Sequence, residues 1–388
     1  MKISKAIIYD INLGKDFHSQ WNPIIIKIET DEGIYGLGEV GLAYGNASKA
    51  AFGILRDFSS AYLIGFDPNQ IELMWDKLFR RTFWGQGGGP VIFGGISAID
   101  EALWDIKGKM LGVPVYELLG GKVRDKIRVY ANDWYSGLVH PEEYAEAASK
   151  VKADGFNALK FDPFATSESK EWDYPPRNID SQRAKLAVER VKAVRNAVGD
   201  DVDILIEVHG NLGTTAAIQI GKQLEEFKPF FYEEPVDALN IDCMKKVSEN
   251  VNIPIAAGER LYTRYGFRQY IEKQAVDILQ PDINLAGGLS EAKKIASYAE
   301  TYNLHVQPHN CGSPVATAVS VNFDACTTNF IIQEWFPYWH RKDDRLNIVK
   351  ESFEPCAKDS YFSIPNKPGL GVELNDSFVQ KFDCVEIS

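Results

Sequence analysis

Eight short runs rich in apolar residues alternate with amphipathic helical runs between residues 127 and 334, and this rhythm limits the possible folds more than any other feature. The predicted strands are 127–132, 158–162, 202–207, 230–233, 253–257, 276–280, 305–308 and 330–334. Repeated strand–helix units pack as parallel strands with helices outside, and eight can close into a barrel. We therefore predict an α/β fold with a TIM-like barrel over residues 123–340. An open doubly wound sheet is the alternative, but no predicted strand is followed by a glycine-rich dinucleotide turn.

The chain before and after the barrel region follows other patterns. Runs typical of antiparallel strands and hairpins occur at 2–11, 24–30 and 34–40. A helical spacing follows at 96–110, so we predict an α+β domain over residues 1–122. The segment 341–388 loses the strand–helix rhythm and is interrupted by prolines and glycines. We expect it to return to the first domain.

Charge and cysteine content restrict the partners and the compartment. The chain of 388 residues has a net charge of −12, which argues against nucleic acid and against an anionic membrane surface. Its 5 cysteines are scattered without a Cys-x-x-Cys pair, which fits a reducing compartment. Neither a signal sequence nor a run long enough to span a membrane is apparent. We expect a cytoplasmic protein that binds neither nucleic acid nor a membrane.

Three predicted strands end at a glutamate or two residues before one. The interval from Glu207 to Glu233 and from Glu233 to Glu259 is 26 residues each time. Active sites in such barrels lie at the carboxyl ends of the strands, so the spacing predicts that the three carboxylates meet there. Such carboxylates repel one another unless a cation neutralises them, and oxygen ligands favour Mg²⁺, with Mn²⁺ as second choice. A strand cap or surface ion pair would explain one such glutamate, but explains three less well.

Two histidines are the acid/base candidates. His209 lies two residues after Glu207, and a strand period of two would place both side chains on one face. His309 and Asp282 end adjacent predicted strands, where an Asp–His hydrogen bond would orient the imidazole and raise its basicity. An exposed turn histidine is the alternative for His209.

Further residues are candidates for substrate binding. Lys160 and Asp162 end the second predicted strand and should face the barrel mouth, where Lys160 could bind a substrate carboxylate or instead form an internal ion pair. His18 lies in an early loop that could close over the site. Trp84 and Trp335 could line the site, although packing is the commoner role for such aromatic residues.

Several motifs together resemble the enolase superfamily, specifically its mandelate racemase-like branch. They are the segments 97–109 and 118–121, Tyr232-Glu233-Glu234-Pro235, Gly258-Glu259-Arg260, Gln280-Pro281-Asp282 and Gly287-Gly288. The resemblance covers nearly the whole chain and implies a modified (β/α)₇β barrel with an α+β capping domain. It also implies Mg²⁺ on the three glutamates, an enolate intermediate, and His309–Asp282 as an acid/base pair. Glu334 would hydrogen-bond the substrate carboxylate or enolate oxygen.

Two departures from the racemase pattern narrow the expected reaction. Asp162 stands where racemases of this branch carry a base lysine, and His209 follows Glu207 in a Glu-x-His arrangement. That arrangement, and the segment 158–164, resemble acid-sugar dehydratases of the gluconate and galactonate type. Glu207 stands where many members have aspartate, and it remains a competent oxygen ligand.

The resemblance implies dehydration of an aldonate to a 2-keto-3-deoxy acid by a homo-oligomer, either a dimer or an octamer. His309 would take the C2 proton and His209 would protonate the departing 3-hydroxyl. An epimerase, a racemase or a sugar-lactone cycloisomerase could use the same enolate. An acid-sugar-binding barrel without turnover is the alternative of another class.

Overall fold

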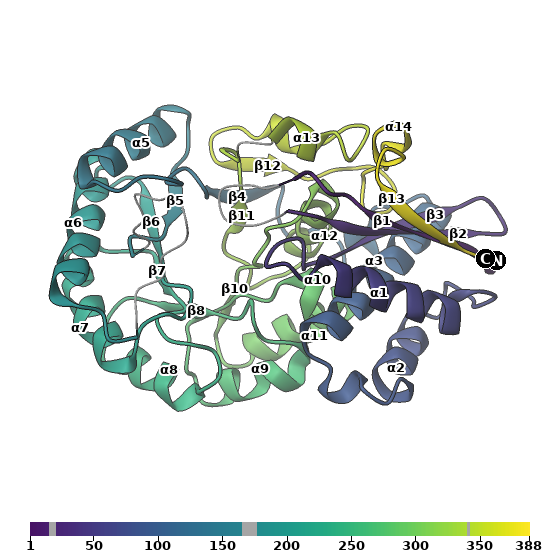
Figure 1. Ribbon diagram of the computed structural model, residues 1–388, viewed down its shortest axis with the longest axis horizontal. Helices are drawn as coiled ribbons and strands as arrows, with labels where there is room; N and C mark the ends of the chain where they lie inside the picture. The colour runs from purple at the N-terminus through teal and green to yellow at the C-terminus, as the bar shows by residue number, and fades with distance from the viewer. Residues whose placement is uncertain (15–20, 165–176, 340–341) are drawn as a thin grey trace.

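The computed structural model describes residues 1–14, 21–164, 177–339 and 342–388. Their elements form a parallel barrel and, beside it, an antiparallel sheet with helices (Figure 1). The predicted fold class is confirmed. No helix in these ranges is long and apolar enough to cross a membrane.

The antiparallel part, here called the capping domain, is built on a sheet of order β13-β1-β2-β3. Its strands are β1 (Ile3–Asp10), β2 (Ile24–Thr30), β3 (Tyr35–Val40) and β13 (Asp383–Ile387). Its helical segments are α1 (Ser48–Phe58), η1 (Ser59–Leu63), α2 (Ile71–Arg81), η2 (Gly85–Gly87), α3 (Gly89–Leu111) and α4 (Val115–Leu118). Ile26 and Ile28 of β2 pack in one buried cluster with Ile99 and Leu103 of α3, whereas Ile25 packs in another. The period of two along the strand thus gives each sheet face its own core.

The barrel strands pair in the order β10-β9-β8-β7-β6-β5-β4-β11. Their bounds are β4 (Lys126–Ala131), β5 (Ala158–Phe161), β6 (Asp203–Glu207), β7 (Phe231–Glu233), β8 (Ile255–Ala257), β9 (Ile278–Leu279), β10 (His305–Val306) and β11 (Gln333–Trp335). A parallel bridge between Val306 and Phe330 connects β10 with the chain entering β11. This bridge joins the two ends of the strand order, so the sheet closes on itself.

Helices connect the barrel strands. They are α5 (Pro141–Ala153), α6 (Ser181–Val198), α7 (Thr214–Leu224), η3 (Glu225–Phe227), α8 (Ile241–Ser248), α9 (Thr263–Glu272), α10 (Ile283–Ala286), α11 (Gly288–Glu300) and α12 (Pro314–Ala325). The barrel meets the capping domain largely through α10 and α11, which lie against α3.

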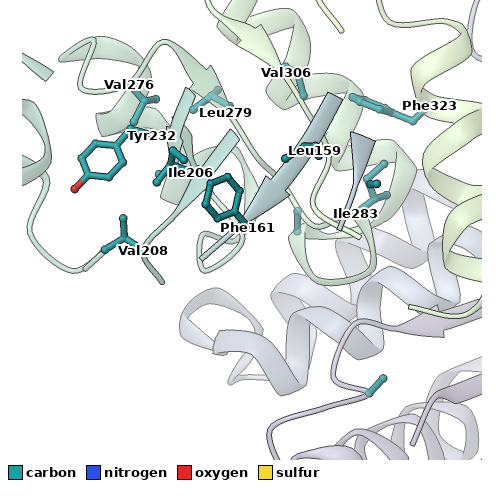
Figure 2. Packing of buried hydrophobic residues seen from close by; sticks show 14 of the residues in the cluster. Leu159, Phe161, Ile206, Val208, Tyr232, Val276, Leu279, Ile283, Val306 and Phe323 are labelled. Carbon is teal, nitrogen blue, oxygen red and sulfur yellow. The ribbon is translucent and has the colours of Figure 1, made fainter. Parts of the chain in front are cut away.

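Alternation along each barrel strand separates an outer apolar layer from an inner one. Phe161, Ile206 and Tyr232, on three neighbouring strands, belong to the large cluster that also includes buried residues of the surrounding helices (Figure 2). Leu205 and Phe231, on the opposite face, belong to a small separate cluster inside the barrel. This inner face continues into Lys160, Glu207 and Glu233, because residues two apart share a face. These charged side chains therefore close the barrel interior at the carboxyl ends of the strands.

The chain after the barrel contacts both parts of the molecule. Its elements are α13 (Lys342–Leu346), η4 (Glu354–Cys356), β12 (Tyr361–Ser363), α14 (Asp376–Val379) and β13. Strand β12 pairs antiparallel with β4, and β13 pairs antiparallel with β1, with Ala6 opposite Ile387. The final strand therefore lies in the capping sheet, beside the start of the chain (Figure 1). Domain boundaries at residues 122 and 340 stay predictions.

Candidate active site

The candidate site lies at the carboxyl ends of the barrel strands, here called the barrel mouth. Glu207 is the last residue of β6 and Glu233 the last residue of β7, and the two are register partners. Their equal height follows from the parallel pairing. Both side chains are almost completely buried.

Glu259 reaches the mouth in a different way. Strand β8 ends at Ala257, and Glu233 pairs with Ala256, so Glu259 lies beyond the register that its spacing suggested. Between them, Gly258 has φ +152°, and a Cβ there would lie 2.7 Å from the backbone nitrogen of Gln280. Only glycine lets the chain approach β9 so closely and turn at this point.

Lys160 of β5 is the central cation of the mouth. Its ammonium nitrogen lies 3.1 Å from Oε2 of Glu207, 2.8 Å from Oε1 of Glu233 and 3.0 Å from Oε1 of Glu334. Desolvation opposes the charge on this buried lysine, but the carboxylates, Glu233 first, raise its pKa well above the usual value. The internal ion pair considered for Lys160 is therefore present.

The carboxylates of the mouth respond differently to burial. Burial, reinforced by the neighbouring charge of Glu207, raises the pKa of Glu233 well above its usual value. Burial also acts to raise the pKa of Glu207, but the charges of His209 and Lys160 outweigh it and lower that pKa.

Oε2 of Glu233 has no hydrogen-bond donor among the described residues. In the described ranges, no three Asp, Glu, His or Cys side chains are arranged so that together they could hold a metal ion.

His309 and Asp282 form a buried pair, as the adjacent strand ends predicted. Nδ1 of His309 lies 2.9 Å from Oδ2 of Asp282, and the two residues also form a parallel β-bridge. The other ring nitrogen, Nε2, lies 3.2 Å from Glu259 and 3.8 Å from Glu334. Burial alone would lower the pKa of His309, but the charges of Glu259 and Glu334 raise it to about 10.

His209 forms a second pair, with Asp162. Its Nδ1 lies 2.8 Å from Oδ2 of Asp162, the residue after β5. Strand β6 ends at Glu207 and His209 has a left-handed φ of +54°, so the strand period that led to His209 does not explain its orientation. Oε1 of Glu207 instead accepts the His209 backbone N–H at 2.8 Å. Burial would lower the pKa of His209, but Glu207 and Asp162 raise it.

Glu334 of β11 is the best-bonded carboxylate of the mouth. It accepts hydrogen bonds from the Asn132 side chain at 2.8 Å and from the Asn310 backbone N–H at 2.9 Å, in addition to its contact with Lys160. Burial acts to raise the pKa of Glu334, but Lys160 and His309 lower it. These contacts stabilise the ionised form.

Negative charge exceeds positive charge at this end of the barrel. Arg260, which follows Glu259, contacts Glu259 at 2.8 Å and is also paired with Glu234. Each carboxylate of this group contacts at least one basic side chain of the group. The carboxylates are Asp162, Glu207, Glu233, Glu234, Glu259, Asp282 and Glu334, and the basic side chains are Lys160, His209, Arg260 and His309. Seven carboxylates thus share four basic groups, a formal excess of three, and the raised pKa of Glu233 accompanies this crowding.

The structure does not bring every predicted substrate contact into this group. Trp335 packs on Phe156 and Phe362, and its indole N–H donates to Glu354 at 3.1 Å, so its ring belongs to a separate apolar cluster. Trp84 is 70% exposed and its ring lies against Phe83. His18 lies outside the described residues. These contacts argue for packing as the role of Trp335.

Some members of the site were not foreseen. Asn132 and Asn310 hold Glu334, and Asp162 pairs with His209 rather than only facing the mouth. The sequence could have predicted the His209–Asp162 pair in the same way as His309–Asp282, because Asp162 and His209 also follow adjacent strands. The two asparagines carried no such signal.

Comparison with known families accounts for most of the chain. Residues 13–120 match the family described as mandelate racemase/muconate lactonizing enzyme, N-terminal domain. Residues 143–378 match the family described as enolase C-terminal domain-like.

Individual relatives match over nearly the full length. A D-galactonate dehydratase of Ralstonia pickettii is 37% identical over 98% of this chain and 94% of its own length. A D-gluconate dehydratase of Thermoproteus tenax is 36% identical over 92% of this chain and 69% of its own length. The solved structure of an enolase superfamily member from Salmonella Typhimurium is 41% identical, with a TM-score of 0.94 over 100% of both chains. These matches make the protein an enzyme of the dehydratase class, and the chain belongs to the mandelate racemase/muconate lactonizing enzyme family of the enolase superfamily.

Proposed function

We propose that the protein dehydrates an acid sugar, an aldonate of the gluconate or galactonate kind, to a 2-keto-3-deoxy acid. The observation that carries this proposal is the presence of two His–Asp pairs at one mouth. One pair lies at β5 and β6 and the other at β9 and β10, so in the closed strand order they are on opposite sides. Removing a proton from one carbon and a hydroxyl from the next needs a base and an acid, and two such pairs can supply them separately. The dehydratase names of relatives sharing 36–37% identity support the same substrate class.

We propose Glu207, Glu233 and Glu259 as ligands of Mg²⁺, with Mn²⁺ as a substitute. The residues fit such an ion, because they offer oxygen ligands, carry excess negative charge and include the unpartnered Oε2 of Glu233. A bound divalent cation would stabilise negative charge on the substrate carboxylate and its enolate. It would compete with Lys160 for Glu207 and Glu233, which the lysine contacts in the described structure.

His309 is assigned to the C2 proton. A base must be neutral before it accepts a proton, whereas the charges of Glu259 and Glu334 raise the His309 pKa to about 10. Neutralisation of Glu259 in its proposed ligand role would remove the larger of these two influences. Asp282 holds Nδ1, which leaves Nε2 to take the proton.

His209 is assigned to the departing 3-hydroxyl. The carboxylates of Glu207 and Asp162 raise its pKa, which favours the protonated form that an acid needs. After the C2 proton has passed to His309, the C3–O bond of the resulting enolate breaks, the proton of His209 goes to the departing hydroxyl, and water leaves. The remaining enol becomes the 2-keto acid when its 2-hydroxyl loses a proton and C3 gains one.

Lys160 and Asp162 complete the proposed substrate environment. The ammonium group of Lys160 is suited to a substrate carboxylate, since it already contacts the carboxylate of Glu334. A hydrogen bond from Glu334 to a substrate oxygen would require its protonated form, but its contacts favour the ionised form. We therefore assign Glu334 to holding Lys160, and Asp162 to holding His209.

A screen of aldonates and aldarates with Mg²⁺ tests the proposal, with detection of 2-keto products. We expect a 2-keto-3-deoxy acid from at least one aldonate and loss of product when Mg²⁺ is removed. Proton exchange at C2 without water loss would instead identify an epimerase or racemase, and lactone rearrangement a cycloisomerase. Binding of an aldonate without any product would favour the non-catalytic alternative.

Localisation and assembly stay proposals. Among the described residues, the thiols of Cys243, Cys326 and Cys384 form no disulfide, which is compatible with the proposed cytoplasmic location. We retain the proposal of a homo-oligomer, and native mass measurement would distinguish a dimer from an octamer.

A further inference from the structure

A carboxylate of the capping domain binds the first turn of a barrel helix. Glu39 of β3 is fully buried, and it accepts hydrogen bonds from the backbone N–H of Ser313 at 2.9 Å and of Ala316 at 3.2 Å. The Ser313 hydroxyl also donates to it. These groups begin α12, whose first N–H groups have no partner within the helix. The Ser313 hydroxyl accepts the Val315 N–H at 3.1 Å, and the capping domain supplies the acceptor for the N–H groups of Ser313 and Ala316.

The bound turn is continuous with the loop that carries His309. Ser313 follows His309 by four residues, and the loop between them is held at further points. The Asn310 N–H donates to Glu334 at 2.9 Å, and Arg345 donates to the Gly312 carbonyl at 2.9 Å. Glu39 therefore fixes the far end of a short, firmly bonded segment.

The same strand end also contacts the partner of His309. A Cβ on Gly41 would lie 3.0 Å from Oδ1 and 3.2 Å from Oδ2 of Asp282, and 2.7 Å from Leu285. The Gly41 N–H donates to the Asn284 carbonyl at 3.2 Å. The absence of a side chain at Gly41 thus lets the capping strand lie directly against the Asp282 carboxylate.

We infer that Glu39 and Gly41, together named the β3 clamp, are positioning residues for the His309–Asp282 pair. One contacts the loop after His309 and the other contacts Asp282, so the clamp restrains both members from outside the barrel. The inference rests on the proposed function, in which this pair takes the C2 proton. A small displacement of such a pair lowers the rate of the chemical step much more than substrate affinity.

Asp100 provides a matched control within the same domain. It is also a buried carboxylate of the capping domain that binds the start of a barrel helix, because it accepts the Ser290 N–H at 3.0 Å and the Ser290 hydroxyl at 2.5 Å. Burial raises the pKa of both Glu39 and Asp100 to about 7. Ser290 lies eight residues after Asp282 and belongs to α11, so Asp100 has the same structural role without the link to His309.

The test compares Glu39→Gln with Asp100→Asn in the full-length enzyme with Mg²⁺. We expect similar losses of thermal stability, but a fall in kcat of about tenfold to a hundredfold with little change in KM only for Glu39→Gln. Amide hydrogen exchange of residues 308–317, measured without substrate, should speed up only in that variant. Equal kcat in the two variants, with equal exchange of residues 308–317, would overturn the inference.

A second pair of variants covers the case in which Glu39→Gln does not fold. Gly41→Ala adds one methyl group against Asp282, whereas Gly53→Ala adds one where nothing lies within 4 Å. We expect kcat to fall only in Gly41→Ala, and unchanged kcat there would count against the clamp. If the wild-type enzyme converts no acid sugar, the proposed function fails, and the exchange of residues 308–317 still decides whether the clamp holds this segment.

Discussion

The two His–Asp pairs at the barrel mouth share one local geometry but have different surroundings. The Nδ1–Oδ2 distance is 2.9 Å for His309–Asp282 and 2.8 Å for His209–Asp162. The His309 side chain is 7% exposed and its Nε2 faces two glutamates, whereas the His209 side chain is 21% exposed and its backbone is left-handed. The same pair can therefore serve opposite proton transfers, because the role depends on the charges and access around the outer nitrogen.

The largest expected effect follows from removing the imidazole of the buried pair. His309→Asn should lower turnover of the aldonate by roughly 10³- to 10⁴-fold, because loss of a general base removes the first step. Steady-state assay of the 2-keto product checks this prediction. His305→Asn, which alters an exposed histidine of β10, should retain wild-type turnover. Near-normal activity of His309→Asn would remove His309 from the mechanism.

Removal of the more exposed imidazole should have a smaller effect on turnover. We expect His209→Asn to lower dehydration by roughly 10²- to 10³-fold, because a hydroxyl leaves poorly without a proton but water can supply one slowly. A substrate analogue with a better leaving group at C3 should lose less activity in this variant. Equal losses for both substrates would argue against acid catalysis by His209.

Lys160 lies between the two pairs and links them to the proposed ligands. Lys160→Met leaves Glu207, Glu233 and Glu334 without their shared cation, which should lower the free energy of unfolding of the metal-free protein by about 3–5 kcal/mol. Mg²⁺ should then raise the melting temperature of this variant more than that of the wild type.

The control for this prediction is Lys109→Met, which breaks a partly buried ion pair with Asp105 in the capping domain. Its melting temperature should respond to Mg²⁺ as the wild type does. A smaller response of Lys160→Met than of the wild type would show that Lys160 assists metal binding and does not compete with it.

The smallest expected effects come from the two aspartates. Asp282→Asn and Asp162→Asn keep the shape of each pair but remove the charge that raises imidazole basicity, so each should lower turnover about tenfold to a hundredfold. Asp282→Asn should slow removal of the C2 proton, whereas Asp162→Asn should slow only the loss of water. The size of the primary deuterium isotope effect at C2 distinguishes them, since it should increase in the first variant and decrease in the second. A decrease of the isotope effect in Asp282→Asn and an increase in Asp162→Asn would exchange the roles of the two pairs.

The sequence predicted the parts of the fold that have a clear period. Strands β6 and β7 end at Glu207 and Glu233 as expected, since apolar runs lead directly into these charged residues. The long helix α3 begins at Gly89, before the predicted start at residue 96, because its glycine-rich first turn resembles a loop in composition. Packing against the capping sheet overrides that weak local preference.

The site shows a similar division. Asp282 and His309 lie past the ends of β9 and β10, but a parallel bridge between them keeps the register that the sequence predicted. Glu259 also lies past the end of its strand, and there the equal spacing of 26 residues did not reveal the loss of register. Glu39 could not be found, because its partners Ser313 and Ala316 are far away in the sequence and no period connects them. Contacts between domains depend on how the domains pack, so the residue pattern within one strand does not predict them.

Deuterium incorporation in His209→Asn decides whether the two pairs perform separate proton transfers. The variant is incubated with the aldonate and Mg²⁺ in D₂O, and both the recovered substrate and the 2-keto product are analysed. We expect deuterium at C2 of the recovered aldonate with little product, because His309 still removes and returns the proton. Product formation at the wild-type rate, or recovered substrate without deuterium, would show that the two pairs do not perform separate transfers.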